Sequence, residues 1–146
     1  MTISKFANHL KTMGSNECII LGVPKNIDAG RITVKKNVNK YDFTSLCRTK
    51  NNFGWNDNYQ LCYFDYDGSK HGDLSPDEVI RYIDSVLSGF ADVSKVIKFS
   101  SSAYIYNDRD ELLSKNNGFH IYFLVNRPER IEEIFKGNLS WLSVKL

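Results

Sequence analysis

The 146-residue sequence predicts one α/β (α+β) domain, in which a mixed sheet carries helices packed on it. Apolar runs typical of strands alternate along the chain with segments whose apolar residues recur at helical spacing. Hydrophobic residues make up 42% of the chain and charged residues 25%, which is ordinary for a globular domain with a buried core. The sequence has no internal repeat, low-complexity tract or linker, so residues 1–146 are expected to form a single domain.

The first part of the chain predicts a helix and two strands. Apolar residues at helical spacing predict an amphipathic helix over residues 3–13. The apolar run 18–23 predicts a strand, and alternation over 31–38 predicts an edge strand after a turn at 26–30. Residues 39–58 show no sustained period, so we expect a surface loop packed down by its aromatic side chains.

The second part predicts three strands and a well-marked helix. Strands are expected at 59–67, 96–99 and 119–125. Between the first two, Ser75 and Glu78 flank a proline and form a capping-box pattern, which predicts a helix start. One face of this helix is expected to be buried through Val79, Ile80, Ile83, Val86, Leu87 and Phe90.

Two further segments complete the pattern. Residues 108–117 are polar and rich in turn formers, which predicts a loop. A final helix is expected from Pro128, and its apolar pattern extends past Gly137 toward Trp141 and Leu142.

Composition excludes several classes of protein. A formal net charge of +2 is too small to indicate nucleic-acid binding by itself. No apolar run reaches the roughly 18 residues that a membrane span needs, and the polar N-terminal segment is not that of a signal peptide, so a cytoplasmic protein is expected. Cys18, Cys47 and Cys62 lack metal-binding spacing and indicate reduced thiols.

The strand at 59–67 ends in two carboxylates, Asp65 and Asp67, separated by one residue. Side chains at these positions of a strand point to the same face, with Cα atoms about 6.6 Å apart. Two such anions repel one another unless a cation lies between them, and Mg²⁺ is bound in proteins by one or two carboxylates. The pattern therefore predicts a divalent-metal site, with a strand followed by an acidic turn as the alternative.

A calcium loop is a competing interpretation of the segment 67–78. Counted from Asp67, Ser69 and His71 fall at positions 3 and 5, Gly72 at 6 and Glu78 at 12, as in an EF-hand. Two features argue against it: an imidazole stands where an oxygen ligand is expected, and the segment before the loop predicts a strand rather than a helix. Glu78 is also explained as a capping residue.

Two polar groups stand at the starts or ends of the other strands. His120 lies two residues after Gly118, in the strand 119–125, where it is a structural residue, a phosphate ligand or a proton donor beside a metal. The run Ser100–Ser102 ends the strand 96–99 and is either a loop or a phosphate contact.

In this order the motifs resemble the archaeo-eukaryotic primase superfamily, and in particular the primase-polymerase domains of phages, plasmids and integrated elements. The run CYFDYD (62–67) is similar to the first family motif, the metal-binding carboxylates. The run NGFHIYFLV (117–125) is similar to the second, whose histidine contacts the phosphates of the incoming nucleotide. CRTKNNFGW and SSSAYIY resemble stretches that flank these motifs. The resemblance covers about residues 45–146 and implies a primase catalytic core with an RRM-like sheet.

The resemblance implies template-directed nucleotidyl transfer, which is primer synthesis or extension on a DNA template from nucleoside triphosphates. Asp65 and Asp67 would hold Mg²⁺ or Mn²⁺, and His120 would steady the triphosphate. The remaining candidates for nucleotide or template contacts are Ser101, Ser102, Arg48 and Lys50. A helicase domain in the parent protein is an open possibility, and the expected setting is a bacterial cytoplasm with a phage or plasmid gene.

Two departures from the family pattern affect these expectations. The second motif is often Ser-x-His, and Gly118 replaces that serine. No strand ending in Asp or Glu follows Val125, so the third acidic motif is absent. We therefore expect an N-terminal portion of a catalytic domain, incomplete at its C-terminus and weakly active or inactive alone. A non-catalytic nucleic-acid-binding or interaction module remains the alternative.

Overall fold

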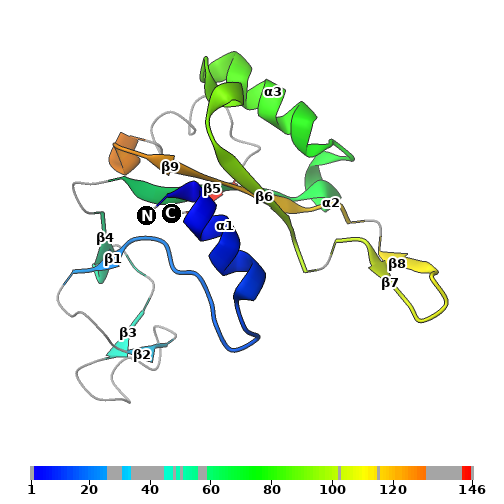
Figure 1. Ribbon diagram of the computed structural model, residues 1–146, viewed down its shortest axis with the longest axis horizontal. Coiled ribbons are helices and arrows are strands. Elements are labelled where there is room, and N and C mark those ends of the chain that lie inside the picture. The colour runs from blue at the N-terminus through cyan, green and yellow to red at the C-terminus, as the bar shows by residue number, and fades with distance from the viewer. Residues whose placement is uncertain are drawn as a thin grey trace.

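The computed structural model describes residues 2–25, 31–33, 45–47, 49, 51–55, 59–101, 103–114, 116–130 and 143–145 (Figure 1). Its centre is a four-stranded sheet in the order β10-β5-β9-β6, and every pairing in it is antiparallel. The strands are β5 (Gln60–Tyr66), β6 (Lys95–Phe99), β9 (Phe119–Val125) and β10 (Ser143–Lys145). The predicted class, a sheet with helices packed on it, is confirmed. The central sheet is antiparallel rather than mixed, because β9 enters between β5 and β6 and runs against both.

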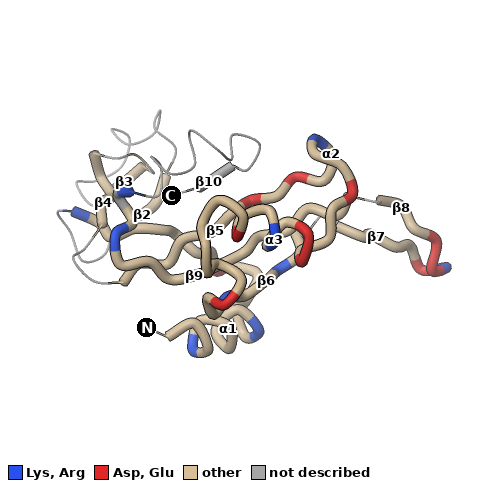
Figure 2. The backbone as a smooth tube through the Cα atoms, turned by 90° about the horizontal axis from the view of Figure 1, so that it is seen from above, with Lys and Arg blue, Asp and Glu red and all other residues tan. Residues whose placement is uncertain are grey.

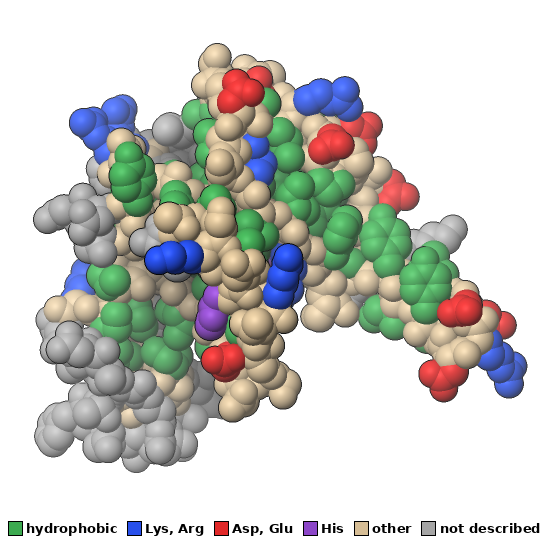
Figure 3. All heavy atoms as spheres, viewed as in Figure 1, with side chains coloured by type: hydrophobic (Ala, Val, Ile, Leu, Met, Phe, Trp, Pro, Cys, Tyr) green, Lys and Arg blue, Asp and Glu red, His purple; other side chains and the backbone are tan. Residues whose placement is uncertain are grey.

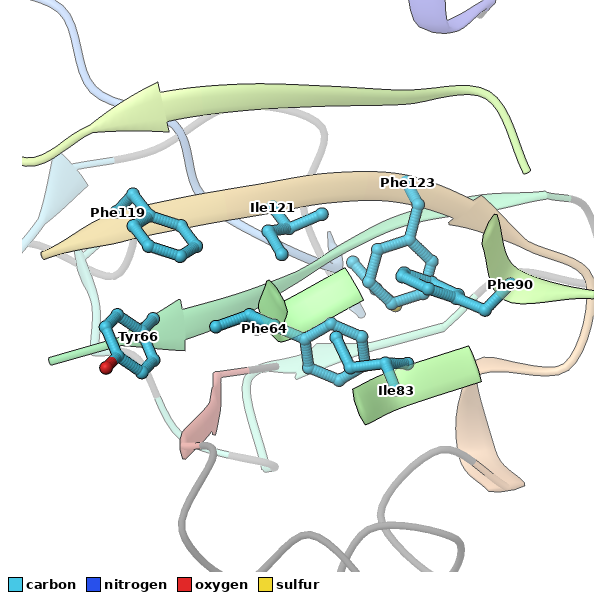
Figure 4. Close-up of a cluster of buried hydrophobic side chains, with 9 residues drawn as sticks. Phe64, Tyr66, Ile83, Phe90, Phe119, Ile121 and Phe123 are labelled. Carbon is cyan, nitrogen blue, oxygen red and sulfur yellow. The ribbon is translucent and has the colours of Figure 1, made fainter. Parts of the chain in front are cut away.

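The first face of the sheet carries the main hydrophobic core. Alternate residues of β5 and β9 point to this face, and their rings stack across the strands: Phe64 on Phe123 and Tyr66 on Phe119, each with 4.8 Å between ring centroids (Figure 4). Ile83 of the covering helix is fully buried against them. The complete cluster of buried residues is Cys62, Phe64, Tyr66, Val79, Ile83, Phe90, Phe119, Ile121 and Phe123.

Helix α3 (Pro76–Val86) covers this face and begins where the sequence predicts. Ser75 and Glu78 form the expected capping box, in which the Glu78 carboxylate accepts from the Ser75 backbone N–H at 2.8 Å. The helix ends earlier than predicted, at Val86, because Leu87 leaves the helical conformation with φ of −118° and ψ of 81°. Phe90 still reaches the core, but from a separate 3-10 helix, η2 (Phe90–Asp92).

Helix α1 (Ile3–Thr12) packs on the opposite face of the sheet, which confirms the helix predicted at 3–13 (Figure 1). Its Phe6 is buried with a ring centroid 5.1 Å from that of Tyr122. Leu21 and Leu61 complete the buried part of this second cluster. Within the described part of the chain, the two faces therefore have separate cores.

The prediction of a strand at 18–23 is wrong. Only β1 (Val23–Pro24) forms there, and it pairs with β4 (Phe53–Gly54) outside the central sheet. Gly22 has a φ of 86°, which interrupts the extended backbone, and Leu21 is buried in the second core instead of lying in a strand.

Two other predictions in this part of the chain are only partly covered by the described residues. The edge strand expected at 31–38 appears as β2 (Arg31–Ile32), which runs parallel to β3 (Ser45–Leu46). Residues 34–38 and the turn expected at 26–30 lie outside the described residues. The loop expected over 39–58 contains the short strands β3 and β4 where it is described.

The prediction of a loop over 108–117 is wrong at residues 112–114, which form a strand. β7 (Ile105–Tyr106) and β8 (Leu112–Ser114) form an antiparallel hairpin that projects from the body of the protein (Figures 1 and 2). The sequence did not reveal it because its apolar residues are adjacent rather than alternating and lie exposed in both strands. The predicted final helix starts as a 3-10 turn, η3 (Pro128–Arg130), while Gly137, Trp141 and Leu142 lie outside the described residues.

No helix among the described segments is long and apolar enough to cross a membrane. Cys18 is exposed, Cys47 and Cys62 are buried, and all three thiols are free. Burial raises the pKa of Cys62 to about 12, so this thiol stays protonated and unreactive in the folded protein.

The capping box predicts a measurable loss of stability on Ser75→Ala. The change leaves the Glu78 backbone N–H without its side-chain acceptor, so the free energy of unfolding in urea should fall by about 1 kcal/mol. Ser85→Ala on the same helix is the control, since its hydroxyl bonds to the Tyr82 carbonyl within the helix. Equal losses in the two variants would show that the cap does not stabilise α3.

The same box predicts a dependence on pH. Hydrogen bonds from the Ser75 backbone and side chain hold the pKa of Glu78 below its ordinary value of 4.5. A depressed pKa stabilises the folded state above the ordinary value, and this contribution disappears as the pH falls through the folded-state pKa. The stability difference between wild type and Glu78→Ala should therefore shrink between pH 6 and about pH 3 in urea titrations. A difference that stays constant over this range would contradict it.

Candidate functional site

Two of the predicted site residues meet across the central pair of strands. The register of β5 on β9 places Asp65 directly opposite His120. Asp65 Oδ1 lies 3.2 Å from His120 Nε2, and the two side chains are only 19% and 27% exposed, respectively. The pair lies on the face opposite the α3 core, beside the area that α1 covers. The sheet thus brings together motifs that are distant in the sequence, on a partly desolvated polar surface.

Two tyrosines on the same face surround the imidazole. Tyr122 Oη lies 3.4 Å from His120 Nδ1, and the Tyr63 ring stands edge-on to the imidazole, with 5.1 Å between centroids. Burial, followed by the proximity of Tyr63 and Asp65, raises the pKa of Tyr122, so its phenol keeps its proton. A protonated phenol at Nδ1 favours the tautomer that directs an Nε2–H toward Asp65. Contacts at both ring nitrogens therefore orient His120.

A polar row crosses all four strands of the sheet at this level. The register places Ser143 of β10 opposite Asp65, and Lys98 of β6 opposite His120. The Lys98 side chain is exposed, so its charge is available on the face that carries the site. Sequence reasoning missed Lys98, Tyr63 and Tyr122. Lys98 and Tyr63 become neighbours of His120 only through the register of β6 and β5 on β9.

Asp67 has other partners. It caps the short helix α2 (Gly68–His71), where its Oδ1 accepts from the Ser69 hydroxyl at 2.6 Å and its Oδ2 pairs with Lys70 Nζ at 3.0 Å. The Ser69 hydroxyl, followed by Lys70, holds the pKa of Asp67 below its ordinary value, so the carboxylate is ionised at neutral pH. Within the described ranges, no group of three or more His, Cys, Asp or Glu side chains is arranged to hold a metal.

The donor chemistry of Asp65 and Asp67 nevertheless fits a divalent ion. Two carboxylates supply the hard oxygen ligands that Mg²⁺ and Mn²⁺ take from proteins, with water and phosphate oxygens completing the coordination. Each carboxylate is paired here with a cationic or protonated group: Asp65 with His120 and Asp67 with Lys70. Binding of a metal by both aspartates would therefore require Lys70 to leave Asp67.

The serine segment lies near the start of the His120 strand. The Ser100 backbone N–H donates to the Gly118 carbonyl at 2.8 Å, and Ser101 is exposed in the following turn. Ser100 Oγ also lies 3.2 Å from the point that a Cβ on Gly118 would occupy. A hydroxyl group therefore lies beside Gly118, the position at which the Ser-x-His pattern has its serine. Ser102, Arg48 and Lys50, the other predicted nucleotide contacts, lie outside the described residues.

The calcium alternative gains no support from the loop geometry. An EF-hand loop follows a helix, and here β5 leads directly into Asp67. Glu78 is held in the capping box of α3, and the Asp67 oxygens are held by Ser69 and Lys70.

A buried asparagine holds the loop that follows Asp67. Asn117 is 4% exposed, its Nδ2 donates to the Leu74 carbonyl at 3.1 Å, and its Oδ1 occupies the space that a Cβ on Gly68 would fill. Tyr66 Oη binds the other side of the loop, donating to the Gly72 carbonyl at 2.7 Å and accepting from the Leu74 N–H. Sequence reasoning missed Asn117, although it directly precedes the Gly-x-His motif. Asn117 and Tyr66 together fix the segment that carries Asp67.

Comparison of the chain with family models, curated proteins and solved structures gives no match. Function is therefore inferred from the geometry of the site and from the motifs in the sequence.

The Asn117 contact predicts that Gly68→Ala destabilises the protein. The added methyl group would overlap Asn117 Oδ1, and overpacking of this kind costs about 1–3 kcal/mol in the free energy of unfolding. Gly14→Ala is the control, because its Cβ would meet mainly the flexible end of the Asn16 side chain. In a double-mutant cycle, Asn117→Ala should reduce the cost of Gly68→Ala, because it removes the overlapping oxygen. Additive effects would mean that the two residues do not interact.

Proposed function

We propose that this chain is a nucleotidyltransferase domain of the primase-polymerase type, the type that synthesises or extends primers on a DNA template using nucleoside triphosphates and divalent metal ions. The observation that carries the proposal is the direct contact of Asp65 with His120 across β5 and β9. The two motifs of the primase resemblance contribute one residue each to this contact. A proposed metal ligand and a proposed phosphate ligand are therefore neighbours, as a nucleotide-binding site requires.

The strand connectivity supports a primase-like core. β5, α3, β6 and β9 form a β-α-β-β unit in which β9 lies between β5 and β6, and β10 adds on the outer side of β5. This is the strand order of a split β-α-β sheet, the arrangement found in ferredoxin-like and RRM-like domains. The two central strands carry Asp65 and His120 on the face of the sheet against which α1 packs.

In the proposed reaction each side chain has a separate task. Asp65 and Asp67 hold the metal, which when bound aligns the attacking 3′-hydroxyl and neutralises charge on the triphosphate. When Asp65 binds the metal, the Nε2–H of His120 is released to donate a hydrogen bond to phosphate oxygens, while Tyr122 still orients the ring at Nδ1. Lys98 adds a positive charge on the same face. Ser101 is within the segment that lies beside Gly118 and is available for a further phosphate contact.

The ion pairs seen at the site favour a second candidate function. Asp65 is paired with His120 and Asp67 with Lys70, and ion pairs of this kind also stabilise the end of a strand that binds no metal. A non-catalytic module that binds nucleic acid or protein would have this property. It would bind its partner equally well with and without divalent ions.

Calorimetric titration of Mn²⁺ together with a nucleoside triphosphate tests the proposal. Wild type should bind, and Asp65→Ala/Asp67→Ala should bind at least about tenfold more weakly, because each carboxylate contributes charge to the metal site. The matched control is Asp73→Ala/Asp92→Ala, which removes the same charge from exposed positions and should bind like wild type. His120→Ala should weaken binding of the nucleotide more than binding of Mn²⁺ alone.

Three outcomes would contradict the proposal. Equal binding by the two double variants would show that these aspartates are not metal ligands. No binding by folded wild type would favour the non-catalytic module, which DNA-binding assays in EDTA would then test. A preference for Ca²⁺ over Mg²⁺ that depends on Glu78 would identify the calcium loop instead.

A further inference from the structure

A continuous apolar surface runs from the end of β6 onto the projecting hairpin (Figure 3). The large hydrophobic side chains along it are 37% to 65% exposed. Single exposed hydrophobic residues are common on protein surfaces, but a contiguous group of them marks an interaction site. The hairpin–edge surface, as we name it, consists of Ile97, Phe99, Tyr104, Ile105, Tyr106, Leu112 and Leu113. A hairpin of two short strands is marginally stable in water by itself. The hairpin would therefore become more stable if another protein surface packed against its exposed apolar residues.

The strand at one side of this surface has an open edge. Among the described strands, β6 is the outermost one next to β9. The backbone N–H of Ser100 donates to the Gly118 carbonyl, so Ser100 directs its backbone groups toward the β9 side. Backbone groups alternate along an antiparallel strand, so Val96 and Lys98 also face β9, while Lys95, Ile97 and Phe99 direct theirs to the open edge. Three residues therefore offer donors and acceptors to another strand.

We propose that the hairpin–edge surface is the interface of a symmetric dimer, in which β6 pairs antiparallel with β6 of a second copy about a two-fold axis at Ile97. This register uses all three outward residues, since it pairs Ile97 with Ile97 and Lys95 with Phe99 as hydrogen-bonded pairs. It also places Val96 opposite Lys98, so no lysine faces a lysine. Lys95 does not block the edge, because its ammonium is directed to the Ala91 carbonyl at 2.8 Å.

The distribution of charge favours a second copy as the occupant. Asp108, Arg109, Asp110 and Glu111 at the tip of the hairpin contribute −2 to a chain of net charge +2, so the remainder of the chain carries +4. Figure 2 shows acidic residues at the end of the hairpin, away from the body of its own chain. An acidic tip that projects from a net-basic body is complementary to another copy of the same body. It repels the phosphates of a nucleic acid, which would otherwise be the natural ligand for exposed tyrosines.

The interface does not depend on the proposed function and leaves the candidate site open. Ile97 and Phe99 pair with Ile121 and Phe119, which point to the α3 face of the sheet. Asp65 and His120 lie on the opposite face. Failure of the dimer test would therefore leave the metal and nucleotide test untouched, and the reverse also holds.

Sedimentation equilibrium of the 146-residue chain over micromolar to submillimolar concentrations tests the dimer. Wild type should show a monomer–dimer equilibrium. Ile97→Lys should raise the dissociation constant at least about tenfold, because it places two ammonium groups opposite each other at the axis. Ile105→Ser/Leu113→Ser should also raise it, by removing exposed apolar area from the hairpin. Tyr82→Lys, at a 54% exposed position of α3, is the control and should dimerise like wild type.

Amide hydrogen exchange followed by NMR tests the register independently of any variant. The amides of Lys95, Ile97 and Phe99 should become more protected as the protein concentration rises. Those of Val96 and Lys98, which face β9, should not change. A monomer at all concentrations would overturn the proposal. So would a dimer that is insensitive to Ile97→Lys and to the hairpin variant, open-ended assemblies, or protection that does not alternate along β6.

Discussion

The pairing of β5 with β9 is the constraint on which the rest of the structure depends. Side chains alternate between the faces of a sheet, so a slip of one residue would exchange the two faces completely. The stacked pairs Phe64–Phe123 and Tyr66–Phe119 prevent this, because a slip would expose them and bury charged groups in their place. Asp65 and His120 meet only in this register. Packing of the core thus determines which polar groups become neighbours.

The parts of the fold that could be predicted are those with a strong local signal. The capping box identified the start of α3, and continuous apolar runs identified β5 and β9. The β7–β8 hairpin was missed because both its strands expose apolar residues, and β10 was missed because three residues carry too little pattern. The strand predicted at 18–23 was wrong because burial of Leu21 satisfies an apolar run without any strand partner.

For the candidate site, the sequence singled out candidate residues but did not predict most of their partners. It singled out Asp65, Asp67 and His120 from their positions at the ends of strands. It did not predict that Asp67 would pair with Lys70, because that contact depends on a four-residue helix formed directly after the strand. Nor did it predict Lys98 beside His120, because cross-strand neighbours follow from the register and not from local spacing.

The position of β9 has a consequence for the order of folding during synthesis. β9 lies between β5 and β6 but follows both in the chain, so neither strand has its main partner until residue 125 has left the ribosome. Until then a nascent chain displays the aromatic residues of β5 with its edges unpaired, which is the kind of species that aggregates or recruits chaperones. Helix α3 has local backbone hydrogen bonds and directly follows β5 and α2 in the chain, so it is the element that can cover part of β5 in the meantime. The capping box at Ser75 therefore favours an element that can form before the sheet is complete.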